Sequence, residues 1–145
     1  MKLDQRMQPI QLILSDVDGV LTNGGITYDN QGIESKQFHV RDGLGIKLWQ
    51  RLGNRFGVIT ARSSQIVKMR MSELGVDLVR QGLEEKLPIA MKIIEELQLS
   101  PSEVCFIGDD LADLSLMKRV GLAASVADGV AEVKAVAHIV TKVPG

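Results

Sequence analysis

The feature that most constrains this chain is an apolar run near its start that ends in two aspartates and a glycine. Four of the five residues 10–14 are apolar, and Asp16, Asp18 and Gly19 follow closely. Such a run is typical of a buried parallel strand whose carboxyl end delivers polar groups to a crevice. Both carboxylates are expected to serve one site only if the backbone turns at Val17 or Asp18, and Gly19 permits that turn. Two carboxylates held close together repel each other, so a metal ion or a shared proton between them is implied. The alternative interpretation is that Asp-Gly is only a polar turn after the strand.

Length and charge narrow the class of protein. A chain of 145 residues is long enough to bury a core and short enough for one domain, which we expect to span residues 1–145. Its 17 basic and 18 acidic residues leave no charge excess for nucleic acid or an acidic membrane, so a small ligand is expected. The one cysteine, Cys105, lies in an apolar run and fits a core position and a reducing compartment. Residues 1–9 lack a signal segment and no run reaches membrane-spanning length, so we expect a soluble, cytoplasmic protein.

Apolar runs alternate with amphipathic stretches along most of the chain. This alternation predicts an α/β fold with a Rossmann-like, doubly wound parallel sheet. The expected strands are residues 10–15, 56–60, 76–79 and 104–107, with peripheral strands at 122–126 and 139–141, and the expected helices are 42–52, 63–74, 85–97 and 111–119. In the helix 42–52, Leu44, Leu48 and Leu52 recur every four residues and predict the buried face, widened by Trp49.

One segment, residues 25–40, breaks this alternation. It contains two short strand-like stretches around the turn sequence Asp-Asn-Gln-Gly at residues 29–32, which predicts a projecting β-hairpin. Two lone strands are marginally stable in water, so the hairpin is expected to pack on something else. Another subunit and the chain's own sheet are equally reasonable partners.

Polar residues follow several of the expected strands. Asp16, Asp18, Thr60 and Asp109 each stand at or just beyond a strand's carboxyl end, where parallel sheets bind their ligands. Several carboxylates together suit Mg²⁺, which commonly also binds phosphate oxygens, so a phosphorylated ligand is expected. Lys86, at a helix start, is a candidate for neutralising that phosphate, although a solvated surface lysine is the simpler interpretation. Asp109 or Asp110 has an alternative role as a helix N-cap.

These residues together resemble the haloacid dehalogenase superfamily of phosphohydrolases. Its four motifs have counterparts in Asp16-Val-Asp18-Gly, Ile59-Thr60, Lys86, and Gly108-Asp109-Asp110-Leu-Ala-Asp113. Within the superfamily, the sequence is similar to the 3-deoxy-D-manno-octulosonate 8-phosphate phosphatases, a capless tetrameric branch. That similarity rests on Asp-Val-Asp-Gly-Val-Leu-Thr, on Phe-His-Val-Arg-Asp-Gly-Leu-Gly-Ile at residues 38–46, on Gln81-Gly82 and on Ile-Gly-Asp-Asp-Leu at 107–111.

The resemblance implies a mechanism and a set of site residues. Asp16 is the nucleophile that forms an aspartyl-phosphate, Asp18 is the general acid and base, and Thr60 and Lys86 hold the phosphoryl oxygens. Mg²⁺ is held by the Asp16 side chain, the Asp18 backbone carbonyl and Asp109, with Asp110 or Asp113 behind them. The positions that match the family's substrate contacts are Asp18, His39, Val40, Arg41, Asp42, Gly43, Lys47, Arg62, Arg70 and Lys86. The expected protein is a homotetrameric, Mg²⁺-dependent hydrolase of lipopolysaccharide precursor synthesis without a cap domain.

The sequence departs from the family pattern at two places, and three other functions are alternatives to the one expected. The family usually has Thr-Gly-Arg where this chain has Thr60-Ala61-Arg62, and it commonly continues past Pro144-Gly145 with a glycine-rich tail and a helix. In relatives that tail reaches a neighbour's active site, so its absence here is expected to affect substrate affinity and closure. A sister branch acts on the 9-phosphate of a nine-carbon sialic-type acid and carries an acidic residue in place of Arg62. A noncatalytic tetramerisation module is disfavoured by the intact Asp16, Asp18, Lys86 and Asp109, and a phosphomutase by the lack of a cap.

Overall fold

A six-stranded parallel sheet forms the centre of the computed structural model, which describes residues 1–145. The strand order is β5-β4-β1-β6-β7-β8, and every neighbouring pair is parallel. The strands are β1 (Leu12–Ser15), β4 (Arg55–Ile59), β5 (Leu78–Arg80), β6 (Val104–Gly108), β7 (Leu122–Ser125) and β8 (Ile139–Val140). The α/β prediction is therefore confirmed, and β1, β4, β6 and β7 are largely buried, whereas β5 and β8 at the two edges of the sheet are partly exposed.

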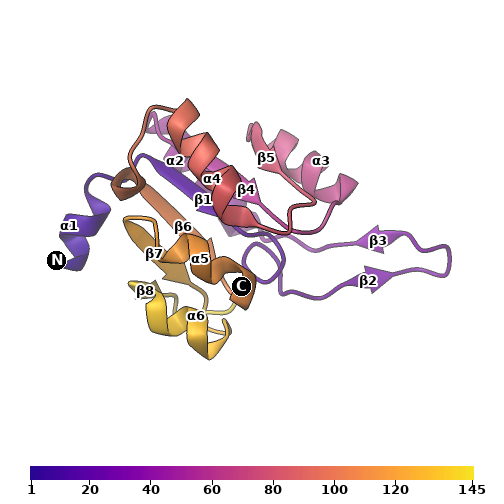
Figure 1. Ribbon diagram of the computed structural model, residues 1–145. Helices are drawn as coiled ribbons and strands as arrows, with labels where there is room; N and C mark the ends of the chain where they lie inside the picture. The colour runs from indigo at the N-terminus through magenta and orange to yellow at the C-terminus, as the bar shows by residue number, and fades with distance from the viewer.

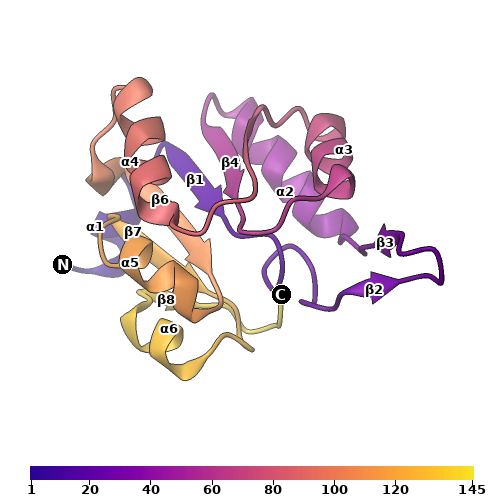
Figure 2. The same ribbon diagram turned by 45° about the vertical axis from the view of Figure 1, so that its right-hand side comes forward.

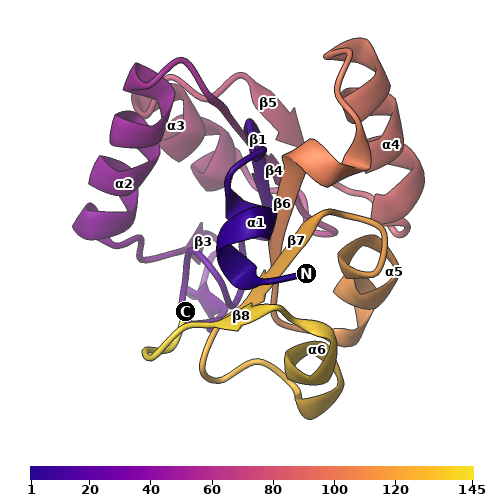
Figure 3. The same ribbon diagram turned by 90° about the vertical axis from the view of Figure 1, so that its left-hand side faces the viewer.

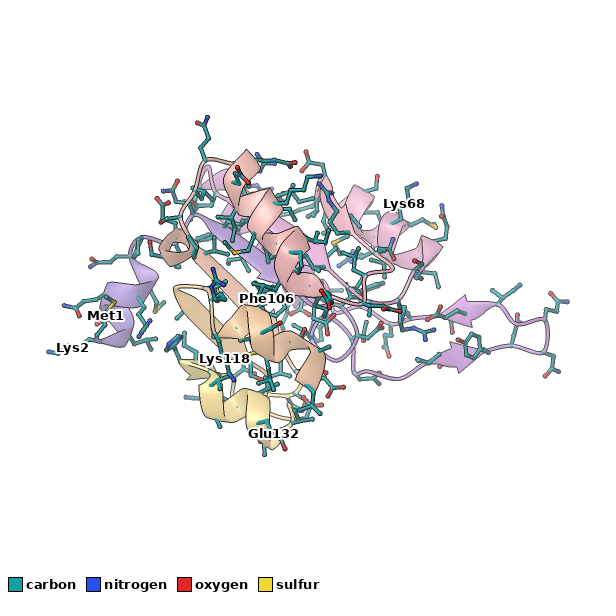
Figure 4. All side chains as sticks on the ribbon, in the orientation of Figure 1. Met1, Lys2, Lys68, Phe106, Lys118 and Glu132 are labelled. Atoms are coloured by element: carbon teal, nitrogen blue, oxygen red, sulfur yellow. The ribbon has the colours of Figure 1, made fainter.

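Helices cover both faces of the sheet (Figure 3). On one face lie α2 (Val40–Arg51) and α3 (Gln65–Glu73), and on the other lie α4 (Lys86–Glu96), α5 (Leu114–Met117) and α6 (Ala131–Val136). The larger apolar cluster, of 13 buried residues, fills the α4–α6 side around Phe106, which is labelled near the middle of Figure 4. A second cluster of 9 buried residues joins β4 to α2 and α3. None of the helices is long and apolar enough to cross a membrane.

The order of the strands reverses between β1 and β6. From β1 the chain passes outward to β4 and β5, and then crosses to β6, β7 and β8 on the other side. Ser15 at the end of β1 is level with Val58 and Ile107 on the two neighbouring strands. In Figure 2 the arrowheads of β1 and β6 point toward the same loop region. Residues that follow these two strands are thus held together at the topological switch point, where ligands bind in such sheets.

The segment 25–40 is a projecting hairpin, as predicted. Its strands β2 (Thr27–Tyr28) and β3 (Glu34–Ser35) pair only with each other, and the ribbon extends away from the rest of the molecule (Figure 1). Asp29 shapes the turn, because its Oδ1 accepts hydrogen bonds from the backbone N–H groups of Gln31 and Ile33 at 2.8 and 2.9 Å. The alternative that the hairpin folds back on its own sheet is therefore wrong.

The predicted buried face of α2 is also wrong. Leu44, Leu48 and Leu52 are 56%, 49% and 77% exposed, whereas Gly43 and Ile46 face the core. The four-residue spacing identifies an apolar row but does not say which side of the helix meets the sheet. Gly43 favours the observed face, since it leaves room for side chains of α3 and its C-cap: a β-carbon there would lie 2.5 Å from a guanidinium nitrogen of Arg70 and 3.2 Å from a methyl carbon of Leu74.

Several element boundaries differ from the sequence prediction. The helix expected over residues 111–119 is a 3₁₀ turn, η2 (Leu111–Asp113), followed by the single-turn helix α5. The strand expected at 76–79 begins later, at Leu78, and two helices, α1 (Leu3–Met7) and α6, were not predicted. The capping box at Ser100 is confirmed as the 3₁₀ turn η1 (Pro101–Glu103). Cys105 is a buried core residue, and its burial raises the pKa of the thiol to about 12.

Candidate active site

The loop after β1 turns as its glycine predicts. The backbone N–H groups of Val20, Leu21 and Thr22 all donate to the carbonyl oxygen of Val17, at 2.9 to 3.3 Å, which curls the chain immediately after the strand. Gly19 lies inside this curl with φ +90°, a value that favours glycine. A β-carbon at Gly19 would also overlap the Oδ2 atom of Asp109. The glycine therefore permits both the turn and the close approach of β1's loop to the end of β6.

Three carboxylates gather at the switch point. Asp16 follows β1, Asp109 follows β6 and Asp113 ends η2, and a carboxylate oxygen from each lies within 4.8 Å of the others. The Oδ2 atom of Asp113 accepts hydrogen bonds from the backbone N–H groups of Asp109 and Asp110, at 2.9 and 3.2 Å. Asp113 is thus fixed from behind, while the Oδ1 atom of Asp109 is buried and has no hydrogen-bond partner. Asp110 caps η2 through its Oδ1, so the N-cap alternative holds for Asp110.

Lys86, the first residue of α4, is the cation of this cluster. Its Nζ lies 3.0 Å from Asp16 Oδ1 and 2.6 Å from Asp113 Oδ1, and its side chain is 3% exposed. The interpretation of Lys86 as a solvated surface lysine is therefore wrong. Although burial alone would lower the pKa of Lys86, the two carboxylates outweigh it and raise that pKa, so Lys86 remains an ammonium.

The electrostatics of the cluster fit a divalent cation. Burial, followed by the neighbouring Asp16, raises the pKa of Asp109 to about 8. Burial also raises the pKa of Asp16, more than the nearby Lys86 lowers it. The raised pKa values show that three ionised carboxylates facing one ammonium would repel one another without a further cation, and Asp109 Oδ1 lacks any donor. Hard carboxylate oxygens are the ligands that Mg²⁺ prefers, so the residues present suit that ion.

Asp18 points away from this carboxylate cluster, toward the base of the hairpin. Its Oδ1 lies 2.5 Å from Lys36 Nζ, and its Oδ2 lies 4.0 Å from the Nε of Arg62. Glu34 joins the same group, because its Oε1 lies 2.9 Å from Lys36 Nζ and 3.5 Å from an Arg62 nitrogen. We call Asp18, Glu34, Lys36 and Arg62 the hairpin ion cluster. Arg62 also donates to the hydroxyl of Tyr28 at 3.0 Å.

Sequence reasoning missed Glu34, Lys36 and Tyr28 as neighbours of the site. The only sequence pattern that could have indicated them is the alternation of charged and aromatic residues on a short hairpin. That pattern does not reveal which side of the hairpin faces Asp18. Thr60 was placed correctly at the edge of the sheet: it follows β4, is 2% exposed, and donates its N–H to the carbonyl of Arg80 at 2.9 Å.

The remaining predicted substrate residues lie elsewhere on the chain, near the start of α2. His39 caps that helix by accepting the backbone N–H of Arg41 at 3.1 Å, and Val40 is 81% exposed. His39, Arg41 and Asp42 line a cavity of about 510 Å³, which also includes residues of the loop after β1 and of the segment 141–145. Asp16, Asp18 and Lys86 do not line this cavity.

Gly43, Lys47 and Arg70 also belong to this region rather than to the carboxylate cluster. Gly43 and Lys47 lie on α2, the helix that His39 caps. Arg70, on α3, packs over Phe38 with 5.9 Å between the guanidinium carbon and the ring centre, and pairs with Glu73 at 3.3 Å. Arg62 and Lys86, by contrast, lie beside Asp18 and Asp16, so the expected substrate contacts of one chain do not all form one group.

Known proteins share both the sequence and the fold. Residues 75–144 match the family model described as haloacid dehalogenase-like hydrolase. The 3-deoxy-D-manno-octulosonate 8-phosphate phosphatase of Yersinia pestis is 39% identical over 97% of this chain and 75% of its own length. Its counterpart in Escherichia coli K12 is 37% identical over 97% of this chain and 74% of its own.

Solved structures of similar proteins share the fold of this chain. The crystal structure of the Yersinia pestis phosphatase superposes with a TM-score of 0.95, over 97% of this chain and 76% of that one. The Moraxella catarrhalis phosphatase, solved with a magnesium ion, a phosphate ion and a KDO molecule, is 37% identical with a TM-score of 0.95, over 97% of this chain and 81% of that one. This chain belongs to the haloacid dehalogenase-like hydrolases and, within them, to the 3-deoxy-D-manno-octulosonate 8-phosphate phosphatase family of phosphoric monoester hydrolases.

Proposed function

We propose that this protein hydrolyses 3-deoxy-D-manno-octulosonate 8-phosphate to the free sugar acid and inorganic phosphate, a step of lipopolysaccharide precursor synthesis. The observation that carries the proposal is the pairing of Asp16 with Lys86 inside a buried carboxylate cluster at the switch point. A noncatalytic module has no need of such a cluster, because three buried carboxylates around one ammonium destabilise a fold that gains nothing from them.

Asp16 is the proposed nucleophile. Its Oδ1 accepts the backbone N–H of Val17 at 2.8 Å and lies 3.0 Å from Lys86, so the plane of the carboxylate is fixed. A carboxylate oxygen of Asp16 forms a bond to phosphorus while the bond from phosphorus to the sugar oxygen breaks. Asp18 donates a proton to the departing sugar oxygen, and then takes a proton from the water that attacks the aspartyl-phosphate. The second step releases phosphate, restores the carboxylate of Asp16 and returns the proton to Asp18.

Lys86 and Thr60 are proposed to hold the phosphoryl oxygens. An ammonium has three N–H donors, and Asp16 and Asp113 engage two of them, which leaves one for the phosphoryl group. Thr60 stands on the neighbouring strand end and brings a hydroxyl to the same edge of the sheet. Such fixed donors stabilise charge that shifts toward the phosphoryl oxygens during transfer.

Asp16, Asp109 and the backbone carbonyl of Asp18 are proposed to hold Mg²⁺. Asp113 stands behind them, because its oxygens already accept from Lys86 and from two backbone N–H groups. When bound, Mg²⁺ offsets the negative charge of the phosphate and of the carboxylates around it.

Substrate recognition is proposed to need more than one chain. The positions 39–43 and 47 lie away from the carboxylate cluster of their own chain. A homotetramer built through the projecting hairpins gives these residues a route to a neighbour's active site. Arg62 lies beside Asp18 in the same chain, so its guanidinium is the nearest candidate partner for the carboxylate of an eight-carbon sugar acid.

The test is phosphate release by the purified protein with Mg²⁺. The panel contains the eight-carbon sugar acid 8-phosphate, a nine-carbon sialic-type acid 9-phosphate, a hexose phosphate and an aryl phosphate. We expect the highest kcat/KM on the eight-carbon acid, loss of turnover with EDTA, and none with Asp16→Asn. Preference for the nine-carbon acid would replace the proposed substrate, and no release from any member would overturn the proposed activity.

A further inference from the structure

Lys36 carries the least exposed charged side chain of the hairpin ion cluster. Its side chain is 1% exposed, although the residues on both sides of it, Ser35 and Gln37, are exposed. The ammonium lies 2.5 Å from Asp18 Oδ1 and 2.9 Å from Glu34 Oε1. Burying a lysine costs free energy unless its charge is paired and hydrogen-bonded, and here both conditions are met by specific partners.

We infer that Lys36 is a positioning residue that holds the carboxylate of Asp18 for proton transfer, an inference that rests on the proposed phosphatase activity. The two cations nearest to the Asp18 carboxylate, Lys36 and Arg62, contact it from the hairpin side of the site, and neither belongs to the loop that carries Asp18. Asp18 lies inside the tight turn after β1, and its own loop supplies no side-chain hydrogen bond to its carboxylate. The hairpin therefore sets the orientation of the proposed general acid.

Glu34 makes this arrangement rigid. The carboxylate of Glu34 accepts a hydrogen bond from Lys36 and forms an ion pair with Arg62. It therefore bridges the two cations that flank Asp18. The hairpin ion cluster contains two acidic and two basic side chains. Lys36 engages only the Oδ1 atom of Asp18, which leaves Oδ2 to carry the proton that the proposed general acid donates. Its geometry thus serves orientation rather than ligand binding. Because Asp18 is 19% exposed, an unrestrained carboxylate there would sample several rotamers in solvent.

The proposed role predicts a dependence on the leaving group. An alkyl phosphate, such as a sugar phosphate, expels a basic alkoxide and needs the proton of Asp18. An aryl phosphate such as p-nitrophenyl phosphate expels a stable anion and needs it far less. General acid catalysis contributes about 10² to 10⁴-fold, so misorienting the acid lowers kcat selectively on the alkyl substrate.

The test is Lys36→Met, assayed with the eight-carbon sugar acid 8-phosphate and with p-nitrophenyl phosphate on one preparation. We expect kcat to fall about tenfold or more on the sugar phosphate and less than about threefold on the aryl phosphate, with partial recovery in Lys36→Arg. Lys68→Met, at an exposed lysine on α3, is the matched control and should leave both rates unchanged. The ratio of the two rates reports on orientation even if the variant is less stable, because both are measured on the same folded fraction.

A double-mutant cycle with Asp18→Asn tests whether Lys36 acts through Asp18. If Lys36 acts through Asp18, adding Lys36→Met to Asp18→Asn should change the sugar phosphate rate by less than about twofold. Equal losses on both substrates, or a further tenfold loss in the double mutant, would overturn the positioning role. Failure of the wild-type protein on both substrates would instead overturn the proposed activity, so the two ideas fail in different ways.

Discussion

Lys86 reaches Asp16 across the switch point: its Nζ lies 3.0 Å from Asp16 Oδ1, and both side chains are nearly enclosed. Asp16 follows the central strand β1, whereas Lys86 begins a helix on one face of the sheet. This one ammonium balances two buried acids. In the proposed mechanism it also offers a donor to the phosphate, which would couple stability and catalysis at a single side chain.

Lys86→Met should impair both properties. Removing one partner from a buried ion pair leaves uncompensated charge and typically costs about 3 to 5 kcal/mol. We expect the free energy of unfolding in urea, measured with EDTA, to fall by about that amount, and kcat to fall on every phosphate substrate. Lys118→Met, at an exposed lysine, is the control. Unchanged stability together with turnover within tenfold of wild type would contradict the assignment.

Asp16→Asn should abolish turnover and leave the fold intact. The substitution keeps the shape of the side chain but removes the anionic nucleophile. It also removes one of the crowded buried carboxylates, so we expect no loss of thermal stability. Phosphate release and a thermal unfolding curve on the same sample check both statements, with deamidation excluded by mass spectrometry. Turnover within tenfold of wild type would rule out Asp16 as the nucleophile.

Arg62→Glu tests which acid is bound. If Arg62 meets the sugar carboxylate, the change replaces attraction by repulsion, and losing a charge-assisted hydrogen bond costs about 1.5 to 3 kcal/mol. We expect KM for the eight-carbon acid to rise by about tenfold or more, and KM for an aryl phosphate, which has no carboxylate, to change little. Glu34→Gln is the control, since it loosens Arg62 from the hairpin without altering its charge. An equal rise for both substrates would indicate damage to the phosphate site instead.

Assembly should depend on the hairpin. Ile26, Tyr28 and Ile33 are 45%, 57% and 60% exposed, and the ribbon's outer backbone groups have no neighbouring strand. Exposed edges and apolar side chains of this kind are normally covered by another chain. Light scattering should give a tetramer for the wild type and a smaller species for Ile33→Glu. A wild-type protein that stays monomeric at micromolar concentration would refute assembly through the hairpin.

His138 should make the protein less stable in mild acid. Its Nδ1 accepts the backbone N–H of Ala123 at 2.9 Å, and burial, with a smaller effect of Arg6, lowers the pKa of His138 below 6.5. The unfolded state therefore takes up the proton first, and stability is lost as the pH falls from about 6.5 through the lowered pKa. His138→Asn keeps an acceptor near the same position without a titrating group. Urea unfolding at pH 7.5 and pH 5 should show a smaller loss for this variant, and an identical loss would exclude His138 as the cause.

Local chemistry explains which parts of the fold were predictable. The apolar runs of β1, β4 and β6 identify buried strands because parallel strands are covered on both faces. Ser64 caps α3 through its Oγ, as its place before an apolar periodic stretch predicts. The motif residues at strand ends converge because parallel strands end at the same edge of the sheet.

The parts that failed depend on contacts between distant residues. Whether α2 presents Ile46 or Leu48 to the core is decided by packing against α3, which no periodicity within α2 reports. The hairpin ion cluster joins Lys36 to Asp18 only after the ribbon has folded back to the loop, so neither residue carries a local sign of the other. The sequence leaves the burial of Lys86 undecided for the same reason, since its partners Asp16 and Asp113 follow β1 and end η2, far from it in the chain.

The crossing from β5 to β6 also sets the order in which the protein is able to form its active site during synthesis. The stretch from β1 through α4 emerges from the ribosome before β6, and it holds Asp16 and Lys86 but not Asp109 or Asp113. A nascent chain of that length has one edge of β1 unpaired and an incomplete set of carboxylates. Contacts that span most of a chain form slowly. The set of carboxylates is thus expected to be complete only after β6 has inserted beside β1, so the ligands for a divalent cation do not exist together earlier in synthesis.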